Sequence, residues 1–219
     1  MAATKKDASK DEKAELVTIE PLNFQTVRFR IRGITPLVQH KFSAKAIRQI
    51  MDGQEKGATG NSRKKREPRQ FAEDFVQAQH ISEAGWNGIP ASALRNACIS
   101  ACRTAGYVMT RAKLSLFIEP DGLDKTEGTP LVKLIADPPE KFTAYVRNET
   151  GVIDIRVRPM WRKWAADVNI TFDASMLRES DVGNLLERAG QQVGIGEGRP
   201  DGKKSAGMGW GRFTATAAP

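Results

Sequence analysis

The stretch VRFRIRGI, residues 27–34, alternates between apolar and charged side chains up to its glycine. Val27, Phe29 and Ile31 fall on one side of an extended chain, and three arginines fall on the other. Those arginines are Arg28, Arg30 and Arg32. A period of two is typical of a β-strand with one buried face and one exposed face. The stretch therefore predicts a strand that packs on a core and presents arginines on its other side.

Helices and further strands are expected along the rest of the chain. Residues 90–104 are the clearest helix, because Pro90 suits a first turn and small apolar residues recur at helical spacing. The other expected helices are residues 43–51, residues 68–79 and a late helix capped by Ser180 or Asp181. The other expected strands are residues 113–118, 131–135, 142–147, 152–158, 167–172 and 212–216. This order predicts an α+β domain with a modified ferredoxin-like, RRM-like βαββαβ core that carries an inserted hairpin.

Size and composition limit the class of protein. The 219 residues suffice for one domain with a sizeable core, and 40% of them are hydrophobic. No run of about 18 apolar residues occurs in the sequence, so we expect no membrane partner. Residues 1–13 lack the apolar segment of a secretory signal, and two cysteines exclude a disulfide scaffold. We therefore expect a cytoplasmic protein.

Positive charge is concentrated in one part of the sequence. The chain carries a net charge of +8, and residues 21–70 alone hold twelve Lys and Arg against three acids. We expect residues 1–24 to be a disordered tail and residues 25–219 a single domain with a flexible insertion at 52–69. The insertion contains the basic run Arg63, Lys64, Lys65 and Arg66. A local surplus of positive charge favours binding to a polyanion such as nucleic acid. The alternative interpretation of the basic run is a solvated loop tip with no partner.

Glycine is the dominant residue near the end of the chain. Residues 190–211 hold eight glycines in twenty-two positions, and glycine permits positive φ and close backbone approach. Successive free N–H groups in such a loop form an anion-binding nest, which predicts contacts to a phosphate backbone. The residues expected to make them are Gly194, Gly196, Gly198, Arg199, Lys203, Lys204 and Arg212. A tight connection between a helix and a strand is the alternative interpretation.

A second arginine-bearing strand and several tryptophans add to this basic character. Arg156 and Arg158 alternate with apolar residues, and arginine suits phosphate contacts because its guanidinium donates several hydrogen bonds. The phosphate interpretation gains if this arginine face coincides with that of residues 27–34. Trp161 lies among basic residues, where it would stack on an unpaired base, as would Trp164 and Trp210. Burial of these rings in the core is the alternative.

Candidates for catalysis and metal binding are few. His40 follows the first strand and is a weak candidate for the general base of RNA cleavage, an ordinary loop histidine being the alternative. Cys98 and Cys102 have no second pair to complete a zinc site, so we expect them to be core residues. We expect no metal and no cofactor.

Four short segments together resemble the RAMP superfamily of CRISPR-associated proteins. The segments are ITPL (34–37), GIPASALR (88–95), GIGEGRP (194–200) and GMGWGRF (207–213). The resemblance is closest to the backbone subunit that polymerises along a guide RNA, and small uncharacterised proteins of tailed phages share the glycine-rich ending. It implies a helical filament on a single strand, with the glycine loop on the strand backbone. It also implies that Ser92 and Arg95 lie at the binding cleft and that residues 52–69 form a variable finger.

These observations predict a non-catalytic protein that binds single-stranded RNA or DNA and oligomerises along it through phosphate contacts. Other subunits of a nucleoprotein complex are further expected partners. The alternatives are a metal-independent RNA endonuclease of the same superfamily and a phage structural or interaction protein that binds an acidic partner. A phage-encoded protein would act in the cytosol of its bacterial host.

Overall fold

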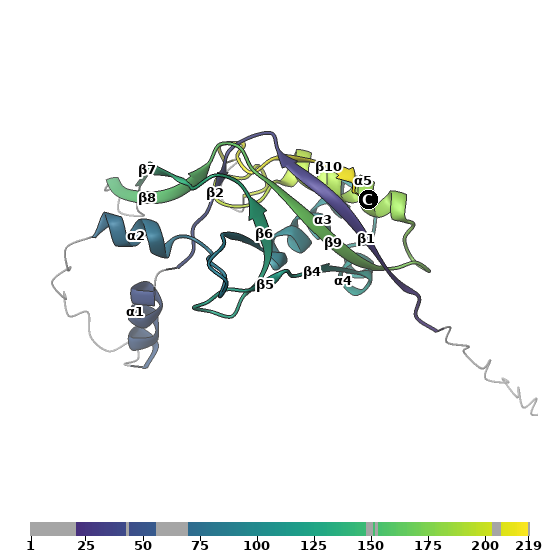
Figure 1. Cartoon of the computed structure of the whole chain (residues 1–219), viewed down its shortest axis with the longest axis horizontal. Helices are drawn as coiled ribbons and strands as arrows, with labels where there is room; N and C mark the ends of the chain where they lie inside the picture. The colour runs from purple at the N-terminus through teal and green to yellow at the C-terminus, as the bar shows by residue number, and fades with distance from the viewer. Residues whose placement is uncertain are drawn as a thin grey trace, which may run out of the picture.

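The computed structural model describes most of the chain in several segments. These are residues 21–42, 44–55, 70–147, 151, 153–202 and 207–218. The described residues form α-helices and two antiparallel sheets, which confirms the predicted α+β class (Figure 1). Residues 1–20 of the predicted tail and residues 56–69 of the predicted insertion lie outside the described residues.

The larger sheet has seven strands, and all its pairings are antiparallel. The strands are β1 (Phe24–Gly33), β3 (Gly88–Pro90), β4 (Leu116–Glu119), β5 (Gly122–Leu123), β6 (Pro130–Ile135), β9 (Ala165–Asp173) and β10 (Phe213–Ala217). β1 lies between β10 and β9, and the other edge of β9 is shared by β4 and β6. Through the middle of the sheet the strands therefore run in the order β10-β1-β9-β4.

The smaller sheet is a hairpin with one short additional strand. Its strands are β2 (Leu37–Val38), β7 (Glu140–Arg147) and β8 (Ile153–Trp161), with β8 in the middle. β2 follows β1 after a short turn, β7 follows β6 after four residues and β9 follows β8 after three, so three short chain crossings join this sheet to the larger one. The indole Nε1 of Trp164 donates to the carbonyl of Thr35 at 2.9 Å and joins the β8–β9 crossing to the β1–β2 crossing.

Two long helices cover one face of the larger sheet, behind β1 and β9 in Figure 1. They are α3 (Ala91–Ala105) and α5 (Glu179–Arg188), which continues into the π-helical turn η1 (Ala189–Val193). The first of them ends at Ala105, one residue beyond the predicted end, where Gly106 adopts a left-handed φ of 69°. The other helices are α1 (Ala44–Glu55), α2 (Phe71–Gln77) and α4 (Met109–Ser115). No helix in the described segments is long and apolar enough to cross a bilayer.

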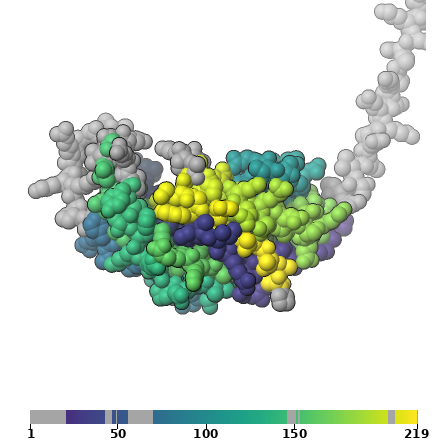
Figure 2. Space-filling view, turned by 90° about the horizontal axis from the view of Figure 1, so that it is seen from above, coloured from purple at the N-terminus to yellow at the C-terminus, as the bar shows by residue number. Residues whose placement is uncertain are grey.

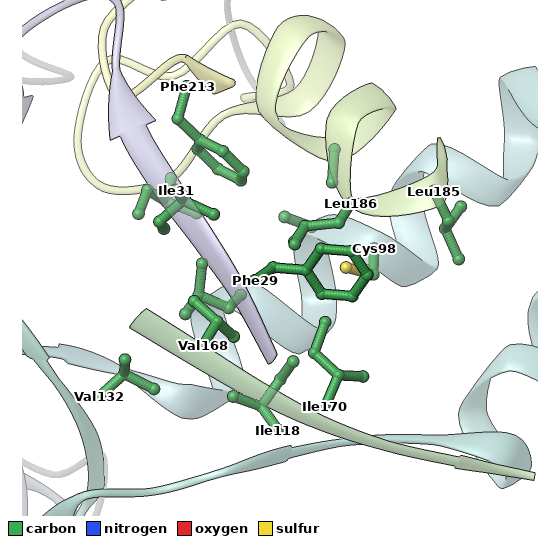
Figure 3. Packing of buried hydrophobic residues seen from close by; sticks show 14 of the residues in the cluster. Phe29, Ile31, Cys98, Ile118, Val132, Val168, Ile170, Leu185, Leu186 and Phe213 are labelled. Carbon is green, nitrogen blue, oxygen red and sulfur yellow. The ribbon is translucent and has the colours of Figure 1, made fainter. Parts of the chain in front are cut away.

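The core lies between this sheet and its helices. Phe29 and Ile31 on β1 are buried there, as the alternation of residues 27–34 predicts, and they meet Cys98 and Leu186 from the helices (Figure 3). Cys98 and Cys102 are both free and buried, which confirms that they are core residues. Burial raises the pKa of the Cys98 thiol to about 12, so this side chain is an inert apolar group at neutral pH.

Several element boundaries differ from the sequence predictions, and three of the differences have a local cause. The strand expected from residue 113 begins only at Leu116, because the preceding residues complete the last turn of α4. The first predicted helix extends to Glu55, four residues into the expected insertion. The late helix begins at Glu179 and not at a cap formed by Ser180 or Asp181. Instead, the Asp181 carboxylate accepts the backbone N–H of Arg178 at 3.1 Å in a capping box.

Candidate nucleic-acid interface

The glycine-rich loop, residues 194–211, connects η1 to β10 and is tied to the crossing between β1 and β2. The N–H of Glu197 donates to the carbonyl of Val38, and the N–H of Gly211 donates to the carbonyl of Pro36, both at 2.8 Å. Within the loop, the N–H of Ile195 donates to the carbonyl of Gly211 at 3.0 Å. These contacts hold both halves of the described loop against the β1–β2 segment.

Hydrogen bonds within the chain occupy several of the loop amides that were expected to be free. The N–H groups that donate to backbone carbonyls of this chain belong to Gly194, Ile195, Glu197, Asp201, Met208, Trp210 and Gly211. A Cβ atom at Gly211 would overlap the carbonyl oxygen of Ile195, and Gly211 has a φ of 67°. Gly194 and Gly211 therefore serve a tight connection and their amides are not free, whereas contacts of Gly196 and Gly198 to a phosphate backbone stay a prediction. Lys203 and Lys204 lie outside the described residues.

Glu197 projects from this loop and joins two side chains of the smaller sheet and its approach. The Arg158 guanidinium on β8 donates to Glu197 Oε2 at 2.7 Å, and the Arg158 side chain is only 8% exposed. His40 Nδ1, just after β2, lies 3.8 Å from the same oxygen. Burial and the positive charge of Arg158 lower the pKa of His40, and Glu197 opposes them. His40 is therefore neutral at neutral pH.

Two aromatic rings and a second arginine border this ion pair. The rings of Phe142 on β7 and Trp210 in the glycine loop meet edge to face, with centroids 5.1 Å apart. Phe142 pairs with Arg158 across the hairpin, so both side chains point to the same face of the sheet as Arg156. The Arg156 side chain is one-third exposed and donates to Asp154 at 3.1 Å.

We call this arrangement the hairpin–loop junction. Its residues are His40, Phe142, Arg156, Arg158, Glu197 and Trp210. In Figure 2 the yellow C-terminal segment lies beside the green hairpin strand, which is the contact that forms the junction. Four features predicted separately from the sequence therefore meet here: the second arginine strand, His40, one tryptophan and the glycine loop.

The arginines of β1 lie elsewhere, on the face of the larger sheet that α3 and α5 leave uncovered. Arg28 and Arg30 both bond Asp167 on the neighbouring β9, with Arg28 at 3.0 Å and the Arg30 guanidinium held through two nitrogens. The two arginines lower the pKa of the Asp167 carboxyl, chiefly through the hydrogen bond from Arg30. Arg32 is exposed at the end of this row. The two arginine faces belong to different sheets and do not coincide.

Several other expected contact residues have structural partners. Arg95 donates from Nε to the carbonyl of Leu116 at 2.8 Å, and Arg212 donates to the backbone and side chain of Gln191. Arg199 donates to the carbonyl of Gly196 at 3.2 Å and stays half-buried. Ser92 is exposed in the first turn of α3. Residues 63–66 lie outside the described residues.

The tryptophans divide between the core and the junction. Trp161 is 3% exposed and Trp164 is 4% exposed, so both rings are packed inside the molecule. For these two rings the structure therefore shows the alternative to base stacking, which was burial in the core. Neither ring is available on the surface for stacking. Trp210 is half-buried and keeps an accessible part.

A buried polar cluster joins three other parts of the chain. Lys41 Nζ donates to Asp124 Oδ1 at 2.5 Å and to Thr126 Oγ1 at 2.7 Å, and His80 Nδ1 lies 3.5 Å from Asp124 Oδ2. Burial alone would raise the pKa of Asp124, but hydrogen bonds from Lys41 and Thr126 hold it well below its usual range. Burial and the charge of Lys41 lower the pKa of His80.

Sequence reasoning missed Glu197, Phe142 and this polar cluster. The sequence does offer a reason to single out Glu197, because it is the one carboxylate inside the run GIGEGRP. Lys41, His80 and Asp124 are separated by about forty residues each and share no motif, so nothing in the sequence brings them together. No group of three or more His, Cys, Asp or Glu in the described part of the chain is placed to hold a metal ion.

Comparison with protein-family models and with curated proteins finds no match for this chain.

Proposed function

We propose that this chain is a non-catalytic protein that binds single-stranded RNA or DNA and oligomerises along it through phosphate-backbone contacts. The observation that carries the proposal is the hairpin–loop junction, where arginine, a neutral histidine and two accessible aromatic rings share one surface. Guanidinium groups suit phosphates, and aromatic rings accept any base by stacking. Such a surface would bind with little preference for sequence.

The arrangement of the core supports the finer fold assignment that this proposal uses. Along the chain, β1 leads to α3 and β4, and β9 leads to α5 and β10, while in the sheet these strands lie in the order β10-β1-β9-β4. We infer a modified ferredoxin-like βαββαβ core. In this assignment the β7–β8 hairpin is an insertion between the second and third core strands. The insertion supplies Phe142, Arg156 and Arg158 to the junction.

The arginines at and beside the junction have two different roles, one structural and one in binding. Arg158 is buried and bonded to Glu197, so it positions the loop. Arg156 in the junction and Arg199 in the adjoining glycine loop are partly exposed and are the described cations that we assign to phosphates. The resemblance to the guide-RNA-binding backbone subunit agrees with a strand that follows the glycine-rich loop.

The test of this proposal is a salt titration with a charge-matched control. Binding of fluorescent oligo(U) and oligo(dT) is followed by anisotropy for the wild type and for the double variant Arg156→Ala and Arg199→Ala. Each phosphate contact on a single strand contributes about 0.7 to the slope of log affinity against log salt, so the slope should shrink by about 1.4. The control is Arg162→Ala with Arg188→Ala, which removes two exposed arginines outside the junction. Equal slopes in the two double variants would refute the proposal.

A metal-independent RNA endonuclease is the second candidate, and one observation favours it. His40 is neutral, partly exposed and next to Arg158 and Glu197, as a general base requires. Cleavage of labelled RNA that persists in EDTA and disappears in His40→Ala would establish this activity. Cleavage that is unchanged in His40→Ala would remove it.

A further inference from the structure

Two phenylalanines form an exposed aromatic pair on the uncovered face of the larger sheet, away from the junction. Phe24 begins β1 and Phe117 lies on β4, and their centroids are 5.9 Å apart in an edge-to-face arrangement. Phe24 is 44% exposed and Phe117 is 38% exposed. The neighbours Leu116 and Ile118 are buried on the opposite face, so Phe117 points outward because of its place in the strand.

Arg95 fixes this pair in position. Its guanidinium lies 4.8 Å from the centre of the Phe117 ring. The same guanidinium donates to the carbonyls of Leu116 and Lys113, which holds it at the edge of β4. A ring that is fixed from one side and exposed on another loses little freedom when a flat group stacks on it.

The surface beside the pair offers hydrogen-bonding groups and little net charge. Asn169 on β9 pairs with Arg28 on one side and with Glu119 on the other, so the three side chains form one row across the face. Thr26 and Thr171 form the next row and share a hydrogen bond of 2.8 Å. An amide that offers both donor and acceptor atoms matches the edge of a nucleobase. A phosphate is attracted less strongly to this face than to the junction, because the negative charges of Glu119 and Asp167 offset the positive charges of the arginines.

We propose that Phe24 and Phe117 form a second binding site that takes unpaired nucleobases by stacking, with Asn169 at the base edge. The proposal rests on the proposed function, because its ligand is the same single strand. The two sites differ in physics. Binding at the junction includes contacts between arginines and phosphates, which salt weakens. Binding at this second site depends on ring contact, which salt does not screen.

The experiment measures oligo(U) affinity and its salt slope for the double variant Phe24→Ala and Phe117→Ala. Base–aromatic stacking predicts an affinity loss of about fivefold or more with an unchanged slope. Phe117→Trp should keep the affinity, because the larger ring stacks at least as well. Phe71→Ala is the matched control, since it removes an exposed ring on α2 that belongs to neither site. Thermal melting of each variant verifies that it is folded.

Ultraviolet crosslinking to oligo(U) gives an independent readout. Tryptic digestion should place crosslinks on peptide 114–125, which contains Phe117. A folded double variant that binds as the wild type does, with crosslinks only on junction peptides, would overturn the second site and leave the proposed function standing. No binding of oligo(U) or oligo(dT) by the wild type would overturn both. An affinity loss without a crosslink on peptide 114–125 also counts against the second site.

Discussion

At the scale of single residues, Arg158 and Glu197 show how an ion pair offsets the cost of burying a charge in this protein. Arg158 is almost fully buried, and its guanidinium donates to the Glu197 carboxylate at 2.7 Å and to the carbonyl of Val157 at 3.4 Å. A buried ion must be paired, because transfer from water costs several kcal/mol that only a close opposite charge offsets. The pair therefore fixes the glycine loop on β8 more firmly than a surface ion pair would.

This argument predicts that Glu197→Gln destabilises the fold by about 2 kcal/mol, since Arg158 would keep its charge without an opposite one. The Glu197 side chain is partly exposed, which keeps the expected value below that for a fully buried pair. Urea denaturation followed by circular dichroism measures the effect. Glu127→Gln, at an exposed glutamate, is the control and should change the free energy of unfolding by less than about 0.5 kcal/mol. Equal midpoints for the two variants would mean that Arg158 finds water or another partner.

At the scale of elements, the sequence pattern predicts where the strands lie, but it does not predict which distant segments contact them. The alternation of residues 27–34 identifies β1, and that of Ile153, Ile155 and Val157 identifies β8. Alternation also makes Arg158 look like a solvent-facing residue, since nothing nearby in sequence shows that a loop forty residues later covers it. Several amides of the glycine loop are occupied for the same reason. Their acceptors include Pro36 and Val38, far away in sequence.

Asp124 ties together three elements and predicts how stability depends on pH. Its pKa is depressed in the folded state, so its stabilising contribution is complete above the unfolded pKa of about 3.9 and is lost as pH falls below it. Asp124→Asn should cost about 3 kcal/mol at pH 7, where Lys41 would be left buried without a counter-charge. The difference from the wild type should narrow at pH 3. Urea midpoints at both pH values measure it, and a difference that widens on acidification would contradict this assignment.

At the scale of the whole molecule, exposed apolar side chains mark surfaces that the described chain leaves uncovered. Figure 1 shows α1 standing away from both sheets, and its residues Ile50 and Met51 are about half exposed. The hairpin carries a second exposed group, Tyr145 and Ile153, on the face turned away from the junction. Exposed apolar side chains that gather on a surface are typical of protein association sites. Two different surfaces on one chain suit head-to-tail contacts, which build open assemblies instead of closed dimers.

Head-to-tail assembly along a strand predicts that the mass of the complex grows with the length of the nucleic acid. Light scattering after size exclusion, with oligo(U) of increasing length, should show steps of one protomer for the wild type. Ile50→Ser with Met51→Ser should stop this growth, because it removes the apolar contact of α1, and should leave affinity for a short oligonucleotide unchanged. Leu114→Ser is the control, since it changes an exposed leucine on α4 outside both apolar groups. Growth that persists in the α1 variant would mean that neighbouring protomers meet through another surface, and growth absent in the wild type would leave a protein that binds single strands one copy at a time.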